Sequence, residues 1–283
     1  MPITRRGFAS RLFAWHRQAE RRLVIREAAT PWEVLVAEVM SQQTGIERVG
    51  PYWRSFVDRW PSPTALAAAG TRDLLAAWAG LGYNRRALAL RAAAASIVED
   101  HAGRVPAAIQ QLGLLPGIGP YTARAIAATA FGVPVAPLDV NVIRVVSRVT
   151  GQAPGSAGLQ GVADDLVARR HARRWLNAVM DLAASVCTKT SPSCTRCPLW
   201  QMCTVRGDIP IAVRARAPTP FPQTRRWLRG RLIASLAEAP EGAWQPLPVR
   251  LGEHERDAIA AAALSLEREG FIEVHEGHAR VRP

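Results

Sequence analysis

The chain before residue 205 reads as a succession of short helices, and this pattern limits the possible folds more than any other feature. Apolar side chains recur at helical spacing in segments such as WEVLVAEVM, TRDLLAAWAGL and RRALALRAAAASIVEDH, and Gly, Pro or Ser-Pro breaks separate these segments. Further helices are expected over residues 7–22, from about residue 140, and over 158–170 and 172–186. Because no alternating strand pattern interrupts them, the sequence predicts an all-α fold for this part.

The chain is also strongly basic. It has 283 residues, of which 48% are hydrophobic, and a formal net charge of +13. The apolar fraction is enough for a sizeable core, and the charge indicates a polyanionic partner, with nucleic acid the first candidate. A GC-rich genome would also favour Arg and Ala, although it explains the shortage of acidic residues less well. The start MPITRRGFASRLF weakly resembles a twin-arginine export signal, but charged residues interrupt the apolar stretch that such a signal needs. No run approaches the ~18 apolar residues of a membrane span, so we expect a cytoplasmic protein with no membrane partner.

All four cysteines of the chain fall in one short segment with the spacing C-x6-C-x2-C-x5-C. Clustered thiols in a chain of this size indicate a metal centre in a reducing compartment rather than disulfide bonds. Four thiolates can hold one zinc ion or a 4Fe–4S cluster. Zinc sites usually pair two short C-x2-4-C elements, and only Cys194 and Cys197 form one here. The prolines and basic residues around the thiols disfavour buried, unliganded cysteines.

The stretch LGLLPGIGPYTARAIAATA at residues 112–130 places a P-G-I-G turn between two helical segments. Successive backbone N–H groups at the start of a helix form an anion site that suits a phosphate. The alternative is a tight turn between helices with no ligand. Because no strand precedes the turn, a dinucleotide-binding fold is not supported.

Two carboxylates stand out from their surroundings. Glu38 lies within VLVAEVM, where apolar neighbours would desolvate the carboxyl and raise its pKa, as a general acid requires. Asp139 precedes the helix expected from Val140 and suits its N-cap, where a carboxylate stays ionised. Taken singly, Glu38 could instead be an edge residue of a core helix and Asp139 only a cap.

The motifs occur together in an order that resembles a known family. EVMSQQT, GLGY at 80–83, LLPGIGPYTA, LDVNVIRV and the cysteine spacing are similar to those of the endonuclease III-like helix-hairpin-helix superfamily, and in their order to its MutY-type adenine DNA glycosylases. The resemblance extends from about residue 8 to 203. It implies an all-α, two-lobed helix-hairpin-helix DNA glycosylase fold with an iron–sulfur loop. The implied domains are a six-helix barrel with the hairpin over 30–135 and an iron–sulfur lobe from 1–29 and 136–204.

The resemblance also implies roles for individual residues. Glu38 would protonate the purine, Asp139 would stabilise the oxocarbenium-like sugar, and Tyr121 and Asn141 would assist them. Gln43 and Tyr83 would enter the base stack, and Gly117 and Gly119 belong to the hairpin. Arg26 and Ser41 would flank the base pocket. The full set of implied DNA-binding residues is Gln42, Gln43, Tyr83, Arg85, Gly117, Gly119 and Lys189. The 4Fe–4S ligands would be Cys187, Cys194, Cys197 and Cys203.

Relatives that also cut the DNA strand use a lysine of the hairpin motif, and this chain has Tyr121 there. Lys189, in the cysteine loop, is the only lysine of the chain, so we expect a monofunctional glycosylase without Lys-dependent lyase activity. The chain departs from the family pattern before Arg26, where Leu23-Val24-Ile25 stands in place of Leu-Pro-Trp, and at Ser41, Asn84 and Val140. Some of these positions flank the base pocket, so the target base is less firmly indicated than the glycosylase fold.

The end of the chain has a different pattern. Residues 205–226 are rich in Pro and Arg without periodicity and are expected to form a linker. Residues 227–283 contain two helical segments and a hairpin-like end, which predicts a small winged-helix-like α+β module.

Three functional hypotheses follow. The first is excision of adenine mispaired with guanine or 8-oxoguanine in base excision repair, by a monomer that binds double-stranded DNA with a mismatch or oxidised base and is associated with the nucleoid. The second is a mismatch-specific thymine or uracil glycosylase on the same scaffold. The third is a non-catalytic iron–sulfur regulator that binds DNA.

Overall fold

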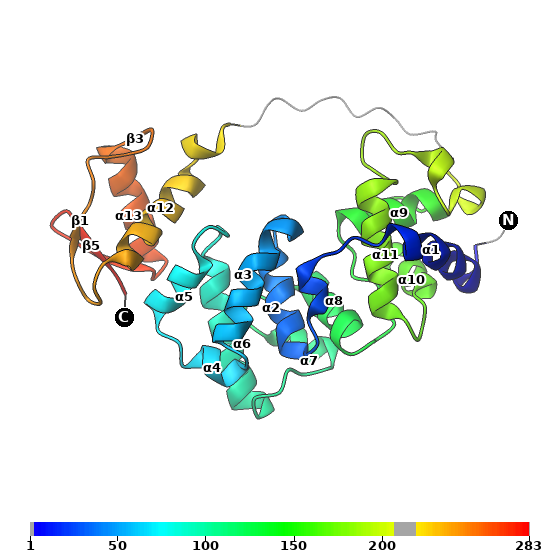
Figure 1. Cartoon of the computed structure of the whole chain (residues 1–283), viewed down its shortest axis with the longest axis horizontal. Helices are drawn as coiled ribbons and strands as arrows, with labels where there is room; N and C mark the ends of the chain where they lie inside the picture. Colours follow the sequence, from blue (N-terminus) through cyan, green and yellow to red (C-terminus); the bar gives the residue numbers. More distant parts are fainter. Residues whose placement is uncertain (1–2, 207–218, 283) are drawn as a thin grey trace. The chain divides into compact units, whose positions relative to one another are not determined.

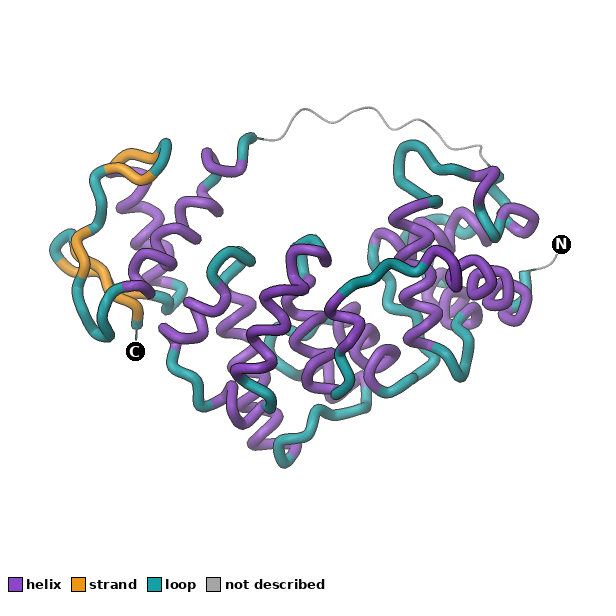
Figure 2. Tube along the Cα trace, in the orientation of Figure 1, coloured by secondary structure: helices purple, strands orange, loops and turns teal. Residues whose placement is uncertain are grey.

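The computed structural model describes residues 3–206 and 219–282, and its architecture is helical with a small sheet near the C-terminus (Figures 1 and 2). Within the described residues, no strand occurs before residue 245, which confirms the predicted all-α class and the small C-terminal α+β module. Most of the predicted linker, residues 207–218, lies outside the described residues. In the described part, no helix is both long and apolar enough to cross a bilayer.

The helices begin and end close to the breaks expected from the sequence. In chain order they are α1 (Arg5–Ala19), η1 (Val24–Glu27), α2 (Pro31–Ser41), α3 (Ile46–Arg59), α4 (Pro63–Ala67), α5 (Thr71–Trp78), α6 (Arg85–His101), α7 (Ile109–Leu114), α8 (Pro120–Ala130), α9 (Val140–Thr150), α10 (Leu159–Leu166), α11 (Ala172–Ser185), η2 (Cys194–Arg196), η3 (Trp200–Met202), η4 (Phe221–Gln223), α12 (Arg225–Glu238) and α13 (Arg256–Arg268).

The described chain forms two compact units. The first contains residues 3–38, 106–114 and 118–206, and the second contains 39–105, 115–117 and 219–282. The core of the first unit is built from α1, α9, α10, α11 and the cysteine loop around the buried rings of Phe8 and Trp175, whose centroids are 6.2 Å apart. Each unit therefore buries apolar surface of its own, and the domain limits predicted from sequence stay a prediction.

A buried carboxylate joins the N-terminal segment to α11 in the first unit. Asp181 is fully buried and accepts hydrogen bonds from His16 Nε2 at 3.0 Å, from the Arg21 backbone N–H at 3.1 Å and from both terminal nitrogens of Arg26 at 2.8 and 2.9 Å. Burial by itself favours the neutral acid, but these donors outweigh it and hold the pKa of Asp181 below its usual range. The segment after α1 is thus fixed by charge-assisted hydrogen bonds.

The second unit contains the helices α3–α6 and the C-terminal module. Aromatic rings of α3 and α5 form its centre. The ring centroids of Phe56 and Trp78 lie 5.8 Å apart in an edge-to-face arrangement. Such pairs contribute about 0.5–1.5 kcal/mol beyond the area that they bury. They hold α5, and with it the loop that leads to Tyr83, in a defined position.

The C-terminal module packs on these helices rather than standing apart within its unit. Its core includes Leu228 and Leu232 of α12 and Phe271, and it extends to Leu75 of α5. Arg72 Nε also donates to the Ala237 carbonyl at 2.9 Å. The sheet has the order β1-β5-β4, in which β4 (Ile272–His275) and β5 (His278–Val281) form the predicted hairpin. The short strands β1 (Gln245–Pro246), β2 (Arg250–Leu251) and β3 (His254–Glu255) were not expected, because two-residue strands leave no periodic pattern.

Candidate active site

Glu38 lies in the last turn of α2, a helix whose start is set by a local capping box. Thr30 Oγ1 accepts from the Glu33 backbone N–H at 3.2 Å, and the Glu33 carboxylate accepts in return from the backbone N–H groups of Ala29 and Thr30. The residues on either side of Glu38, Ala37 and Val39, are buried. The helix therefore carries its carboxyl into an apolar environment, as the sequence predicts.

The surroundings of Glu38 raise the pKa of its carboxyl to near neutral pH. Burial, as the larger cause, and the negative charge of Asp139 together raise its pKa to about 7. A carboxylic acid with this pKa can still hold its proton near neutral pH and can transfer that proton during a reaction. The two carboxyl groups, about a hundred residues apart in the sequence, are thus electrostatically coupled in the first unit.

Asp139 is the N-cap of α9, which confirms that prediction. Its Oδ1 accepts from the backbone N–H groups of Asn141 and Val142 at 2.9 and 2.7 Å, and its Oδ2 accepts from the Asn141 side-chain amide at 2.8 Å. Asn141 Oδ1 accepts in turn from Arg144 at 3.0 Å. Since donors hold the carboxylate in place and the helix N-terminus is positive, a negative charge at Asp139 is stabilised and oriented.

Tyr121 lies in the first turn of α8 and belongs to the same group. Burial, followed by the negative charges of Glu38 and Asp139, raises the pKa of Tyr121 above its usual range. Its hydroxyl therefore remains a neutral hydrogen-bond donor. The structure brings Glu38, Tyr121, Asp139 and Asn141 into one cluster, which combines a neutral acid, a neutral donor and an oriented anion.

The glycine turn before α8 has two glycines with different requirements. Gly117 has φ +77° and a Cβ there would lie 2.8 Å from the Ala89 Cβ, so the fold itself requires glycine. A Cβ on Gly119 would meet nothing within 4 Å. Gly119 is the N-cap of α8 and provides no side-chain cap, and both glycines of the turn are exposed. This geometry lets an anion approach the backbone closely.

The two residues predicted to enter the DNA stack share an unusual backbone conformation. Gln43 has φ +55° and Tyr83 has φ +51°, a left-handed region that few residues other than glycine adopt. Tyr83 is 38% exposed and Gln43 is exposed as well. Residues held in such conformations cluster at functional sites, because the surrounding structure must impose them.

Arg86 provides that constraint, and the sequence reading missed it. Its guanidinium donates to the carbonyls of Met40 and Gln42 at 2.7 and 2.6 Å and to the Gly82 carbonyl at 2.8 Å, with further bonds to Val39, Thr44 and Leu81. Arg86 is 9% exposed, and burial lowers its pKa to about 10. It therefore ties the loop that carries Gln43 to the loop that carries Tyr83. The signal in the sequence was an arginine on the buried stripe of α6 shared with Leu90 and Ile97.

The four cysteines line one small cavity with apolar walls that include Val145, Val149 and Leu182. Burial raises the pKa of Cys197 to about 11, and the charges of the other three thiols contribute. In the described part of the chain, no three His, Cys, Asp or Glu side chains are close enough together to hold a single metal ion. The structure therefore places the four thiols around one cavity.

Two arginines of α9 connect the cysteine loop to the carboxylate cluster. Arg144, which binds Asn141, also donates from Nε to the Cys187 carbonyl at 2.8 Å. Arg148 donates to the carbonyls of Thr188 and Lys189 at 2.7 and 3.1 Å and lies 3.4 Å from the Cys187 sulfur. The loop after Cys187 is therefore shaped by the same helix that Asp139 caps.

The remaining predicted residues are placed as follows. Lys189 is exposed on the cysteine loop, and Arg85 is exposed in the second unit, where it lines one cavity together with Gln42, Gln43 and Tyr83. Gln42 also donates to the Gly117 carbonyl at 3.2 Å. The guanidinium of Arg26 binds Asp181, and Ser41 ends α2 with a buried hydroxyl oxygen that has no hydrogen-bond partner among the described residues. Base-pocket roles for Arg26 and Ser41 stay predictions.

Comparisons with known proteins agree with this geometry. Residues 36–157 match the family model described as "HhH-GPD superfamily base excision DNA repair protein". The chain is 42% identical to the adenine DNA glycosylase of Mycobacterium tuberculosis, over 81% of this chain and 78% of that protein. It is 37% identical to the human adenine DNA glycosylase, over 72% of this chain and 40% of that longer protein. It is also 35% identical to the thymine/uracil-DNA glycosylase of Pyrobaculum aerophilum, over 68% of this chain and 88% of that protein.

Solved structures give the same fold. A thermostable thymine-DNA glycosylase superposes with a TM-score of 0.68 at 25% identity, over 72% of this chain and 97% of that one. Endonuclease III in a non-covalent complex with DNA superposes with a TM-score of 0.62 at 22% identity, over 73% of this chain and 98% of that one. With a glycine turn, a coupled acid and carboxylate, and four clustered cysteines in this fold, the chain belongs to the helix-hairpin-helix superfamily of base excision DNA repair proteins and, within it, to the MutY-type adenine DNA glycosylases.

Proposed function

We propose that the chain is a monofunctional DNA glycosylase that removes adenine paired with guanine or 8-oxoguanine in double-stranded DNA. The observation that carries this proposal is the coupling of Glu38 to Asp139, with the pKa of Glu38 raised to about 7. Breaking a sugar–base bond needs a proton for the leaving base and a negative charge for the developing cation. The carboxylate cluster provides both in one place.

The order of events follows from the chemistry of these side chains. An extruded adenine accepts a proton at N7 from Glu38, which makes the base a better leaving group. As the bond lengthens, positive charge develops on the sugar and is stabilised by Asp139, whose position is fixed by Asn141 and the start of α9. Tyr121 stays protonated and donates a hydrogen bond within the cluster. Water then adds to the sugar and loses a proton, which returns Glu38 to its acid form, and an abasic site remains.

We propose that the protein does not cleave the DNA strand, because the hairpin position where a lyase of this superfamily has its reactive lysine holds no lysine. A lyase of this superfamily needs an amine that attacks the sugar to form an imine. Lys189, the only lysine of the sequence, is exposed on the cysteine loop, and the hairpin position holds Tyr121 instead. We expect borohydride to trap no covalent protein–DNA complex.

Cys187, Cys194, Cys197 and Cys203 are proposed to hold a 4Fe–4S cluster. The shared cavity and the mutual effect of the thiols on their pKa values support this donor set. Bound to iron as thiolates, the four side chains would cross-link the segment after α11, so the role of the cluster is structural. The exposed backbone between Cys187 and Cys194, with Lys189, would then approach a DNA phosphate.

A base-release assay tests the proposal. Duplexes with A opposite 8-oxoguanine, A opposite G, T opposite G and U opposite G are incubated with the protein and then treated with alkali, which cleaves abasic sites. Breaks at A in the first two duplexes are expected, and Glu38→Gln should bind the same duplexes without release. Tight binding with no breaks in any duplex would instead identify a DNA-binding regulator.

Thymine or uracil excision is the second candidate. It is favoured by the 35% identity to a thymine/uracil-DNA glycosylase and by the fold shared with a thymine-DNA glycosylase. Since Glu38 has the pKa of an acid that protonates a purine, we rank adenine first. Breaks confined to the T:G and U:G duplexes would reverse that order.

A further inference from the structure

The second unit contains a cavity of about 440 Å³ beside the predicted stacking residues. One wall is formed by Gln42 and Gln43, a second by residues 82–86, and a third by the first turns of α12 together with Glu269. This volume is within the range of about 300–1,000 Å³ that is typical of ligand-binding clefts. No residue of the carboxylate cluster lines it, so it is a separate feature of the molecule.

The cavity is strongly basic. Five arginines line it, at positions 85, 86, 225, 226 and 229, against one acid, Glu269. Glu269 is already paired with Arg229 through two hydrogen bonds of 2.8 Å, and Arg86 is bound by backbone carbonyls. Arg85, Arg225 and Arg226 thus carry positive charge that no carboxylate in direct contact neutralises, among the residues that the structure describes. An anion would complete the cavity.

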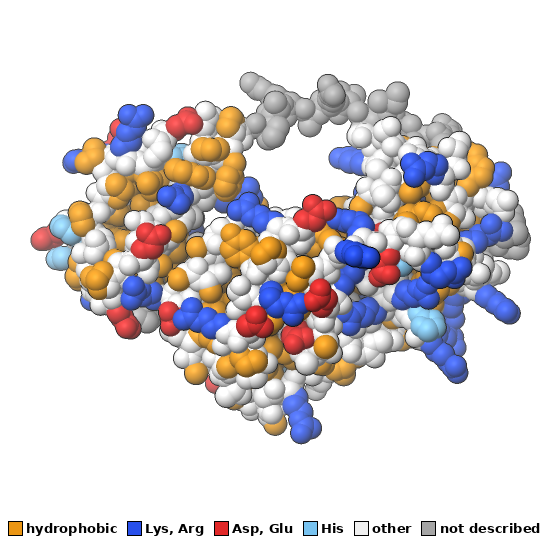
Figure 3. Space-filling view, in the orientation of Figure 1, with side chains coloured by type: hydrophobic (Ala, Val, Ile, Leu, Met, Phe, Trp, Pro, Cys, Tyr) orange, Lys and Arg blue, Asp and Glu red, His pale blue; other side chains and the backbone are white. Residues whose placement is uncertain are grey.

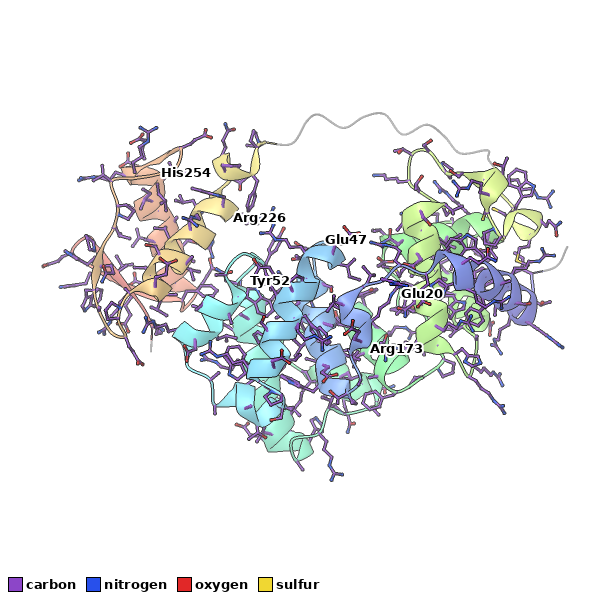
Figure 4. All side chains as sticks on the ribbon, viewed as in Figure 1. Glu20, Glu47, Tyr52, Arg173, Arg226 and His254 are labelled. Atoms are coloured by element: carbon purple, nitrogen blue, oxygen red, sulfur yellow. The ribbon has the colours of Figure 1, made fainter. Side chains whose placement is uncertain are left out.

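Two of these arginines differ in what holds them. Arg226 donates from Nη1 to the Tyr83 hydroxyl at 2.6 Å, and its guanidinium lies 4.9 Å from the centres of the Tyr83 and Phe221 rings. Arg225 is exposed and has no hydrogen bond or ion pair within the described chain. Figure 4 labels Arg226, which extends from α12 toward the loop of Tyr83. Arg226 is therefore held in place by Tyr83, and the neighbouring Arg225 is available to a ligand.

The helix that carries them is firmly anchored. Leu228 and Leu232 of α12 are buried in a core that also contains Leu75, and Arg72 binds the carbonyl at the end of the helix. Basic side chains are spread over the face of the molecule shown in Figure 3. The arginines of α12 are distinguished by a rigid support and a hollow next to Gln43 and Tyr83.

We propose that this cavity binds a backbone phosphate of DNA through Arg225 and Arg226, next to the base step that Gln43 and Tyr83 enter. The guanidinium fork matches two phosphate oxygens, and such contacts position the duplex without reading its sequence. This assignment rests on the proposed function and gives the C-terminal module a role in it. The module supplies the phosphate contact that keeps Tyr83 aligned with the DNA.

The test measures the salt dependence of DNA binding. Glu38→Gln protein, which holds the duplex without releasing a base, is titrated into a labelled duplex with A opposite 8-oxoguanine at several salt concentrations, and anisotropy gives Kd. Each phosphate contact contributes about 0.9 to the slope of log K against log salt. Adding Arg225→Gln should weaken binding several-fold at low salt and lower the slope by about 0.9. Arg231→Gln, an exposed arginine on the same helix that does not line the cavity, should leave the slope unchanged.

Arg226 needs its own control, because it also binds Tyr83. Arg226→Gln should lower the slope by about 0.9, whereas Tyr83→Phe, which removes only the hydroxyl, should not. If Tyr83→Phe lowered the slope as much, Arg226 would act only through Tyr83 and its phosphate contact would be wrong. If Arg225→Gln and Arg231→Gln had equal effects, the general charge of α12 would explain binding and the cavity site would be refuted.

Two further outcomes separate this proposal from the first one. If Arg225→Gln left the slope unchanged but altered preference between 8-oxoguanine and guanine, the cavity would read a base and the phosphate assignment would fail. Wild-type protein without base release would refute the proposed function, while the salt slopes would still decide the phosphate site.

Discussion

At the scale of single residues, this chain places ionisable groups where their surroundings change their behaviour. Glu38 is neutral at pH 6 because burial and the Asp139 charge raise its pKa to about 7. Asp139 has hydrogen-bond donors on both oxygens, which suit an anion. Two identical functional groups are thus suited to opposite tasks, one as a proton donor and the other as a stabiliser of positive charge.

The pKa of Glu38 sets the pH dependence of base release. The protonated acid is the active form, so the single-turnover rate should be highest below about pH 7 and fall up to tenfold per pH unit above it. A quenched-flow pH profile measures this. A rate that stayed constant from pH 6 to 9 would remove Glu38 from the proton transfer.

The same pKa predicts a stability effect. Because the folded pKa lies above the usual value of 4.5, the contribution of Glu38 to the free energy of unfolding is fully present below pH 4.5 and is lost as pH rises through about 7. The loss is up to about 3 kcal/mol. Glu38→Gln does not titrate, so it should be more stable than wild type at pH 8, as measured by urea unfolding.

Asp139 combines a structural and a chemical role, and two substitutions separate them. Asp139→Asn keeps an oxygen that can cap α9 but removes the charge, so base release should fall at least about a hundredfold with little loss of stability. Asp139→Ala should also lower the free energy of unfolding by about 1 kcal/mol. Ser62→Ala, which removes the cap of α4, is the matched control and should lower stability alone. Equal activity in Asp139→Asn and wild type would leave Asp139 as a cap only.

At the scale of elements, charged side chains hold loops and helix ends that packing alone would leave loose. Arg86 joins the end of α2 to the loop before α6 through carbonyls on both sides. Asp181 joins the segment after α1 to α11. In both cases the buried charge is satisfied by several partners, so removing it leaves those partners unpaired.

Arg86 should therefore tolerate little change. Arg86→Lys cannot reach the same set of carbonyls and should lower the free energy of unfolding by about 2–4 kcal/mol. Hydrogen exchange should rise in residues 39–44 and 81–84, where the left-handed Gln43 and Tyr83 lie. Arg85→Lys, at the exposed neighbouring position, should change neither quantity. A stable Arg86→Lys protein with unchanged exchange would show that packing alone holds the two loops.

Asp181 should make the first unit sensitive to acid. Since its folded pKa lies below the usual value, its contribution to stability is present above about pH 4 and is lost as pH falls through the folded pKa. Asp181→Asn should lower the free energy of unfolding by about 3–5 kcal/mol at pH 7, and the difference should shrink in acid. Asp165→Asn, which removes an exposed ion pair with Arg5, should have little effect.

At the scale of the whole molecule, the basic charge and the cysteine loop act over more than one element. The net charge of +13 favours binding to DNA of any sequence. Arg144 contacts both the Cys187 carbonyl and Asn141, so the cysteine loop and the carboxylate cluster share one helix. A 4Fe–4S cluster held by the four cysteines, as proposed above, would therefore support catalysis through structure.

Cys197→Ser tests that expectation. Purified wild-type protein should be brown and contain about four irons per chain, whereas Cys197→Ser should lose colour and iron. It should also release base more slowly and bind DNA more weakly, because the loop after Cys187 loses its cross-link. Lys189→Gln should keep the iron. A colourless wild-type protein with one zinc ion would overturn the assignment.

The helices and several site features could be predicted from the sequence because their causes are local. A helix needs a repeating apolar stripe, and Asp139 caps α9 because it directly precedes Val140. The glycine turn and the cysteine spacing are equally local. Short strands such as β1 could not be predicted, since two residues carry no period.

Contacts between residues distant in the chain could not be predicted in this way, because no local pattern in the sequence indicates them. The sequence by itself determined which side chains could carry a proton, an anion or a metal, since those properties belong to the residue types and their neighbours. The tertiary structure alone decided that Glu38 meets Asp139, that Arg26 is held by Asp181, and that Arg226 reaches Tyr83. The physical reason is that such pairs depend on how helices pack, and packing is set by the whole core rather than by any short segment.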